Sequence, residues 1–392
     1  MRDRKMLGWS WLRALLLAIA MLAGPAWASG GTVLVMRPDN VAAVLAAVKP
    51  GDTIRMEGVF NSRLVITGRD FGGVKVDGRR AVLKEGLQLR LVHNISFDGL
   101  TIGSRDRGTI HLFGALVQTS SHISFSNMKV LGNLDGKGTG MRVLDSRFVT
   151  VRDSHFEGNV DGLQFLTTPD SLAVRNRFVR NESDGVKIVN SQRVIAAHNS
   201  CTDIRKAPKA HPDCIQLWSI VDKPLQSDIY ILNNIAIGTT QGFTSFDPGS
   251  LSGTQLTFAG NYAAITYNHG ITCSGCTDSR FLDNIVISLP ESRNRAMIYH
   301  PLDRGNEAEG NQLFDLRGRF GGDLPLPSFT SLVPSIAGLV GSQWDDRSFG
   351  LLSDVASVPE PGIWLMMLAG WALVGVRLRR VRVRGRLPGC AA

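Results

Sequence analysis

Short runs of alternating apolar and polar residues recur along the middle of the chain, each followed by Asn or Asp and a second apolar pair. Such alternation is typical of β-strands with one buried face. The runs read ISFDGLTI (95–102), ISFSNMKV (123–130), VTVRDSHF (149–156), LAVRNRFV (172–179), VIAAHNSC (194–201), IYILNNIAI (229–237), LTFAGNYAA (256–264) and SRFLDNIVI (279–287). Their first residues lie 22 to 35 positions apart. This spacing predicts a repeated structural unit.

A unit of this size, built from two or three strands, is typical of one coil of a parallel β-helix. Asn suits the bend because it tolerates left-handed dihedrals and can hydrogen-bond to its equivalent in the next coil. The alternative is a β-sandwich, which needs hairpin turns such as Asn-Gly, and these are scarce here. We therefore predict an all-β solenoid and assign residues 29–302 to it, with coils from about residue 50 to 300.

The segment DNVAAVLAAVKPGDTI predicts a short helix from a cap at Asp39 or Asn40 to about Val48, followed by a turn into a strand. This entry resembles that of the pectate-lyase-like superfamily, in which a helix caps the open end of the solenoid. The resemblance extends over residues 32–300 and implies a right-handed parallel β-helix with an N-terminal capping helix. The repeat is lost after about residue 302, and residues 303–357 are expected to form a C-terminal cover and linker.

The second strands of successive coils align as TGMRVL (139–144), DGLQFL (161–166), DGVKIV (184–189), DCIQLW (213–218), QGFTSF (241–246) and HGITCS (269–274). Alternation along a strand places every second side chain on one side of the sheet. The expected inward column is Met141, Leu163, Val186, Ile215, Phe243 and Ile271. The expected outward column is Arg142, Gln164, Lys187, Gln216, Thr244 and Thr272. A second polar column precedes the strands, at Thr139, Asp161, Asp184, Asp213, Gln241 and His269.

These two polar columns predict a strip of amides, carboxylates and cations that crosses six coils, with Trp218 and Phe246 on one border. Amides and carboxylates bind hydroxyls, cations bind uronate carboxylates, and aromatic rings stack on sugar rings. Asp184 and Asp213 are expected to be neighbours on consecutive coils, where paired carboxylates act as acid and base or bind a cation. For Asp161 alone, a turn-forming role is favoured.

Three hypotheses follow for the function. The superfamily resemblance implies a polysaccharide lyase or epimerase that acts on uronate polymers with calcium. In it Lys187 is the base, Arg142 binds the uronate carboxylate, and Asp184 and Asp213 are acid partners or calcium ligands. His211 lies near them in the sequence and is a further catalytic candidate, with a solvated loop residue as the equally favoured alternative. The expected substrate contacts are Asp161, Gln164, Gln216, Trp218 and Phe246.

The second hypothesis is a glycoside hydrolase, because SDGVKI, PDCIQL and NHGITCSG resemble motifs of polygalacturonases. Pro212 stands where that family has Asp, and His269 lies two coils from Asp213. The third hypothesis is a non-catalytic surface solenoid that binds exopolysaccharide.

The two ends of the chain resemble targeting signals. Residues 1–28 have a basic start, an apolar run and Ala26-Trp27-Ala28, which predicts a secretory signal peptide. Residues 358–392 contain Pro-Glu-Pro, an apolar stretch at 363–376 and six arginines, and they resemble the PEP-CTERM sorting signal. That resemblance implies a transmembrane helix, a sorting protease of the exosortase type, and transient contact with the inner membrane. A permanent anchor is the alternative. We expect export by the Sec pathway to the cell surface or extracellular matrix of a Gram-negative bacterium.

Charge and cysteine content refine this picture. The formal net charge is +9, but without the basic residues of both ends 33 Lys and Arg face 33 Asp and Glu, Glu360 included, so nothing favours nucleic acid as a partner. An oxidising compartment permits disulfides. We expect Cys201 and Cys214 to be bonded or within about 7 Å between their Cα atoms. Cys273 and Cys276 fit a tight disulfide or half a zinc site, and the missing second ligand pair disfavours zinc.

Overall fold

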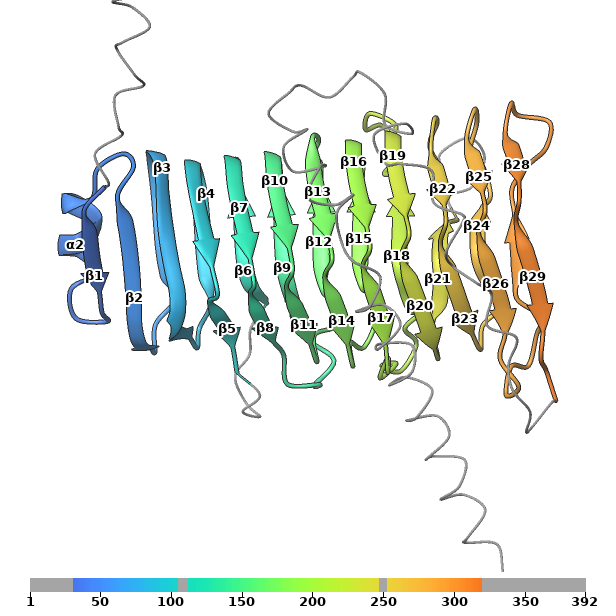
Figure 1. Cartoon of the computed structure of the whole chain (residues 1–392), viewed down its shortest axis with the longest axis horizontal. Helices are drawn as coiled ribbons and strands as arrows, with labels where there is room; N and C mark the ends of the chain where they lie inside the picture. Colours follow the sequence, from blue (N-terminus) through green and yellow to red (C-terminus); the bar gives the residue numbers. More distant parts are fainter. Residues whose placement is uncertain (1–30, 105–111, 247–251, 319–392) are drawn as a thin grey trace, which may run out of the picture.

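The computed structural model describes residues 31–104, 112–246 and 252–318, which wind into a right-handed parallel β-helix (Figure 1). The expected signal peptide (1–28), the sorting signal (358–392) and most of the expected cover (303–357) lie outside the described residues. Within the described ranges, no helix is long and apolar enough to cross a membrane.

Each coil contributes one strand to each of three parallel faces. The first face consists of β6 (Phe113–Gln118), β9 (Thr139–Leu144), β12 (Leu163–Leu166), β15 (Val186–Val189), β18 (Asp213–Trp218), β21 (Gln241–Ser245), β24 (His269–Cys273) and β27 (Met297–Tyr299). The second face consists of β7 (Ser121–Ser126), β10 (Arg147–Arg152), β13 (Ser171–Val174), β16 (Gln192–Ala197), β19 (Ser227–Leu232), β22 (Thr257–Ala259), β25 (Arg280–Leu282) and β28 (Glu307–Glu309). The third face consists of β5 (Thr101–Gly103), β8 (Lys129–Leu131), β11 (His155–Glu157), β14 (Arg177–Val179), β17 (Ser200–Thr202), β20 (Ile235–Gly238), β23 (Tyr262–Ile265), β26 (Ile285–Ser288) and β29 (Gln312–Asp315).

The N-terminal coils use longer strands that continue from one face to the next. These strands are β1 (Val33–Met36), β2 (Thr53–Phe60), β3 (Leu64–Leu83) and β4 (Leu87–Asp98). β4 pairs with β6 through its first part and with β7 through its last part, so it belongs to the first and second faces. The solenoid therefore starts with bent strands and continues with short ones.

A short helix, α2 (Val41–Ala47), closes the N-terminal end of the stack, as predicted (Figure 1). Asn40 occupies the N-cap position, but its side chain makes no capping bond. Its amide instead accepts a hydrogen bond from the Arg37 N–H at 2.7 Å and donates to the Val35 carbonyl at 3.1 Å. The expected cap residue therefore fixes the turn before the helix.

Apolar side chains fill the interior and stack from coil to coil. Phe156 lies on Phe178 with ring centroids 5.0 Å apart, and Phe258 lies on Phe281 at 5.1 Å. A buried aromatic pair of this kind contributes about 1 kcal/mol beyond the area that it buries. The same interior positions on successive coils thus form continuous columns, as the alternation predicted.

An asparagine ladder runs along the bend between the second and third faces, at Asn176, Asn199, Asn234, Asn261, Asn284 and Asn311. The backbone N–H of each of the first five donates to the side-chain oxygen of the next asparagine at 2.9 to 3.0 Å. The predicted bonding between equivalent asparagines is confirmed. The left-handed dihedral belongs to the preceding residue, for example Arg175 and His198 with φ near 55°. The ladder residue itself satisfies buried backbone groups.

The outer surface of the C-terminal half is apolar on two faces. Leu172, Val174, Ile195, Ala197, Leu232 and Ala259 form a buried cluster on the second face, separate from the interior. A second such cluster includes Ile235, Tyr262, Ile285 and Ile287 on the third face. The alternation in the sequence indicated one buried face per strand, whereas these strands have two. They are apolar on both sides, as is common in covered parallel sheets.

The structure also tests three further expectations. The coils continue beyond the expected boundary at residue 302, because β28 and β29 extend the second and third faces to Asp315. Cys201 and Cys214 form a disulfide with their Cα atoms 5.4 Å apart, as predicted. Cys273 and Cys276 are buried free thiols, so the tight disulfide, one of the two alternatives for this pair, is not formed.

Candidate functional site

The strand register confirms the predicted outward column on the first face. Gln164 lies opposite both Arg142 and Lys187, and Gln216 lies opposite Lys187 and Thr244. The inward residues, among them Leu163, are at most 1% exposed. We call the outward column and the column before it the polar strip.

The polar strip is a continuous chain of side-chain contacts. The Arg142 Nε donates to the Gln164 Oε1 at 2.6 Å, and the Gln164 amide in turn donates to Asp161. The Lys187 ammonium lies 2.8 Å from the Asp184 Oδ2 and 3.5 Å from the Asp161 Oδ2. These contacts join residues of three successive coils.

Asp184 continues the chain to the next coil. The backbone N–H of Asp213 donates to the Asp184 Oδ1 at 3.0 Å. Asp213 also accepts hydrogen bonds from the Thr244 hydroxyl at 2.6 Å and from the Gln216 amide at 3.2 Å. The structure therefore brings together seven of the predicted site residues: Arg142, Asp161, Gln164, Asp184, Lys187, Asp213 and Gln216.

The electrostatics of the two buried carboxyls favour their protonated forms. Burial, opposed by the Lys187 charge, raises the pKa of Asp184 to about 6. Burial and the neighbouring Asp184 raise the pKa of Asp213 well above its ordinary value. Asp184 and Asp213 are 1% and 0% exposed, so water does not offset the cost of their charges. Both therefore take up a proton more readily than a carboxyl in water.

The two cationic side chains, Lys187 and Arg142, differ in their partners and in the direction of their pKa shifts. Burial alone would lower the pKa of Lys187, but Asp184 and Asp161 raise it above its ordinary value. Lys187 thus holds its proton. Burial lowers the pKa of Arg142 against the attraction of Asp161, and its guanidinium lies 4.4 Å above the Phe113 ring. Within the described residues, the terminal nitrogens of Arg142 have no hydrogen-bond partner; only its Nε has one.

The family follows from a comparison of sequences. The right handed beta helix region, as the family is described, matches residues 54–219 and 113–286, which together span more than half of the chain. The chain belongs to the right-handed β-helix family. No curated protein matches its sequence.

Solved structures with a similar fold have distant sequences. The A-module of mannuronan C-5 epimerase AlgE4 from Azotobacter vinelandii is 15% identical, with a TM-score of 0.49, 74% of this chain and 87% of that chain covered. Pectate lyase Pel9A is 16% identical, with a TM-score of 0.47 and coverages of 72% and 80%. The surface adhesin PfbA of Streptococcus pneumoniae is 11% identical, with a TM-score of 0.41 and coverages of 64% and 80%. At these identities the similarity concerns the fold alone.

The two aromatic residues expected at the border of the strip, Trp218 and Phe246, differ in how much of their surface is available to a ligand. The Trp218 side chain points outward, as predicted, and the residue is 48% exposed. Phe246 packs edge-on against the His269 ring at 4.6 Å, so part of its surface is used within the protein. His211 is exposed in the segment before β18 and makes no hydrogen bond or ion pair with the strip in the described part of the chain.

The accessible part of the strip is shorter than predicted. Arg142, Lys187 and Gln216 are half-buried, whereas Thr244 and Thr272 are 0% and 2% exposed. In the outward column, the partly accessible side chains therefore extend only from Arg142 to Gln216, and Gln164 between them is 4% exposed.

Sequence reasoning missed one member of this region and one property of another. Phe113 supports Arg142, and the strand FGALVQ could have been aligned one coil before TGMRVL. Gln241 was placed in the second polar column, but the sequence did not show that its side-chain oxygen is buried without a hydrogen-bond partner within the described structure.

A calcium ion at Asp184 and Asp213 stays a prediction, and the geometry argues against it. The described residues contain no group of three or more His, Cys, Asp or Glu side chains arranged to hold a metal. Calcium needs six to eight oxygen ligands. The Lys187 ammonium already lies against Asp184 at 2.8 Å, where a cation would bind. These residues do not fit a calcium site.

Proposed function

We propose that this protein binds an acidic, uronate-containing polysaccharide along the exposed part of the polar strip. The observation that carries the proposal is the Arg142 guanidinium. Its Nε donates to Gln164 and its Cζ lies 4.4 Å from the centre of the Phe113 ring, while its terminal nitrogens have no hydrogen-bond partner within the described residues. A positioned guanidinium with free donors suits a carboxylate, which it can bind through two parallel hydrogen bonds.

Neighbouring residues support a sugar chain at this place. The Lys187 charge is offset by Asp184 and Asp161, so Arg142 carries most of the attraction for an anion. Gln216, on the coil after that of Lys187, offers its side-chain amide to sugar hydroxyls. The exposed Trp218 offers an apolar face to a pyranose ring.

The second candidate is β-elimination, favoured by the raised pKa values of Asp184 and Asp213. In that reaction a base removes the C5 proton, the C4–O4 bond breaks, a C4=C5 double bond forms, and an acid protonates the departing oxygen. A protonated Asp184 or Asp213 is a suitable acid. Lys187 is a poor base because two carboxylates raise its pKa. The geometry therefore favours binding over cleavage.

A screen of the full chain against polygalacturonate, alginate and a neutral glucan tests the proposal, with and without calcium. Retention of the protein by an acidic polymer but not by the neutral one supports binding. New reducing ends together with the absorbance of unsaturated uronates would show a lyase, and reducing ends alone a hydrolase. Absence of retention by every acidic polymer would contradict the proposal.

We also propose that the protein is exported to the cell surface or extracellular matrix and processed by a sorting protease of the exosortase type. The support comes from the sequence of residues 1–28 and 358–392. Cell fractionation with antibodies against the β-helix tests this, and protein confined to the cytoplasm with both ends intact would contradict it.

A further inference from the structure

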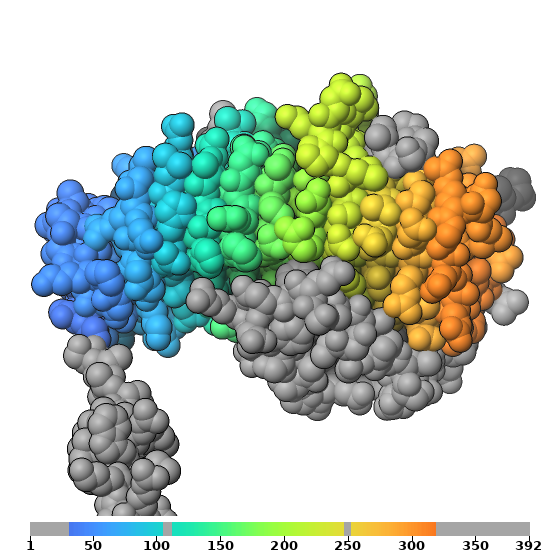
Figure 2. All heavy atoms as spheres, turned by 90° about the horizontal axis from the view of Figure 1, so that it is seen from above, coloured from blue at the N-terminus to red at the C-terminus, as the bar shows by residue number. Residues whose placement is uncertain are grey.

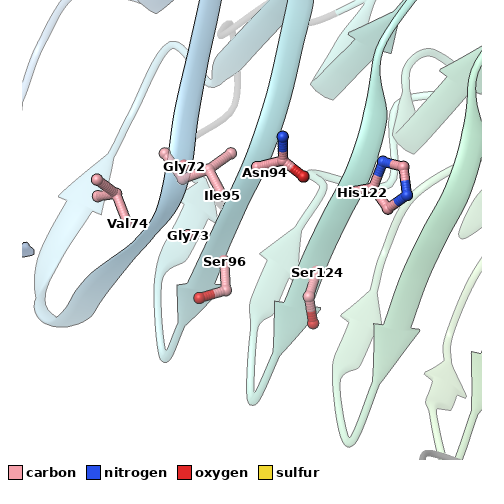
Figure 3. A pocket seen from close by; sticks show the side chains of 8 residues that line it. All are labelled: Gly72, Gly73, Val74, Asn94, Ile95, Ser96, His122 and Ser124. Atoms are coloured by element: carbon pink, nitrogen blue, oxygen red, sulfur yellow. The ribbon is translucent and has the colours of Figure 1, made fainter. Parts of the chain in front are cut away.

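A shallow cavity lies on the second face, near the N-terminal end and away from the face of the polar strip. It has a volume of about 280 Å³ and lies between β3, β4 and β7 (Figure 3). Figure 2 shows this N-terminal part of the solenoid in blue. The volume is close to the lower limit of about 300 Å³ for small-molecule sites. The strip and its residues take no part in this cavity.

A bulge in β3 forms one wall of the cavity. The register between β3 and β4 shifts between Asp70 and Val74, so the intervening residues have no partner in β4. Gly72 has φ +55°, and a Cβ there would lie 2.7 Å from the Pro50 Cβ. Phe71 anchors the bulge in the interior, where it is 1% exposed. The bulge keeps side chains out of this wall, and such bulges are common beside binding sites.

The other walls present polar groups at fixed positions. The Asn94 amide nitrogen donates to both carboxylate oxygens of Asp70, at 2.8 and 2.9 Å. Its oxygen is turned to the side of His122 (Figure 3). Ser96 and Ser124 are paired residues on β4 and β7, and both side chains line the cavity (Figure 3). The lining of the cavity thus includes one amide oxygen and two hydroxyls.

An aromatic edge borders these polar groups. The His122 ring stacks on Phe148 with centroids 4.7 Å apart and an interplanar angle of 25°. Flat rings beside amides and hydroxyls match the apolar faces and hydroxyls of a sugar. The hydrogen bonds from Asn94 and from the Gly72 N–H lower the pKa of Asp70, which stays ionised. A negative charge at the wall disfavours an acidic ligand.

We propose that this cavity is a second carbohydrate site, which takes a neutral, hydroxyl-bearing sugar unit. Asn94, Ser96 and Ser124 hydrogen-bond its hydroxyls, and the ring of His122 contacts its apolar face. The site is independent of the acidic-polymer contact on the first face, because the two share no residue.

Calorimetric titration of the full chain with neutral hexasaccharides of glucose, galactose and mannose tests the site. Ser96→Leu and Ser124→Leu fill the cavity from outward positions, and we expect each to weaken binding at least about tenfold. The matched control is Thr53→Leu, which changes the same outward column two coils before Ser96 and does not line the cavity. Arg142→Gln should also leave neutral-sugar binding unchanged.

Circular dichroism verifies that each variant is folded. If a leucine variant does not fold, His122→Ala carries the test, because this side chain is exposed and its loss should still weaken binding. The proposal is overturned if none of the three hexasaccharides binds. It is also overturned if binding is lost in Arg142→Gln while the cavity variants bind normally.

Discussion

Removing the Lys187 ammonium should destabilise the fold in a way that depends on pH. The variant Lys187→Met keeps the aliphatic stem and deletes the charge that lies 2.8 Å from Asp184 and 3.5 Å from Asp161. The Asp184 side chain is 2% exposed, so water cannot replace the ammonium. Breaking a buried ion pair costs about 3–5 kcal/mol, and the partial exposure of Lys187 places the expected cost near 3 kcal/mol at pH 8.

The sign of the pH dependence follows from Asp184. Its pKa is raised to about 6 in the folded protein, first by burial, so the folded state binds this proton more tightly than the unfolded chain does. The resulting stability is fully present below the unfolded pKa of about 3.9 and is lost as the pH rises through the folded pKa. Without Lys187 the folded pKa rises further. The variant should therefore lose much less stability at pH 5 than at pH 8.

Urea unfolding followed by circular dichroism at pH 5 and pH 8 measures this difference. The double variant Lys187→Met with Asp184→Asn is the control, because its amide oxygen can still accept from the Asp213 N–H and carries no charge. It should recover most of the stability at pH 8. A cost below about 1 kcal/mol at pH 8, or equal costs at both pH values, would refute the reasoning.

Three other predictions concern the solenoid and the strip. Asn234→Ala removes the acceptor for the Asn199 N–H and should cost about 2–4 kcal/mol in urea unfolding, because buried backbone groups lose their partners. An unchanged midpoint would contradict this role. Replacing Cys201 and Cys214 by Ala should cost about 3 kcal/mol in thermal unfolding, and wild type in reductant should behave alike. Asp213→Asn should cost less than about 1 kcal/mol at pH 7 and flatten the loss of stability as the pH rises above the unfolded pKa of about 3.9, since burial raises the pKa of Asp213 in the folded protein; a steeper pH dependence in the variant would oppose this.

The register of the site was predictable because side chains alternate strictly along a strand. A shift of one residue would place Gln164 and Lys187 inside and Leu163 outside, so the apolar pattern fixes both columns. The asparagine ladder was predictable for a similar reason, since equivalent bends must satisfy equivalent backbone groups.

The role of Lys187 was not predictable from this pattern. The sequence shows that Asp184 and Lys187 are three residues apart, but the bend before β15 decides whether they meet. The structure shows an ion pair, which opposes the predicted role of Lys187 as a base. The apolar outer clusters were visible in LAVRNRFV and VIAAHNSC, where Leu172 and Ile195 occupy positions that alternation turns outward.

The affinity of the full chain for a hexauronate, measured by calorimetry, tests the central claim most directly. Arg142→Gln removes the guanidinium, and the matched control Arg147→Gln removes an exposed arginine on the second face. We predict that Arg142→Gln weakens binding about tenfold or more, that Arg147→Gln changes it little, and that added salt weakens binding by wild type. Equal affinities of wild type and Arg142→Gln, or no binding of uronates by wild type, would contradict the proposed acidic-polysaccharide site.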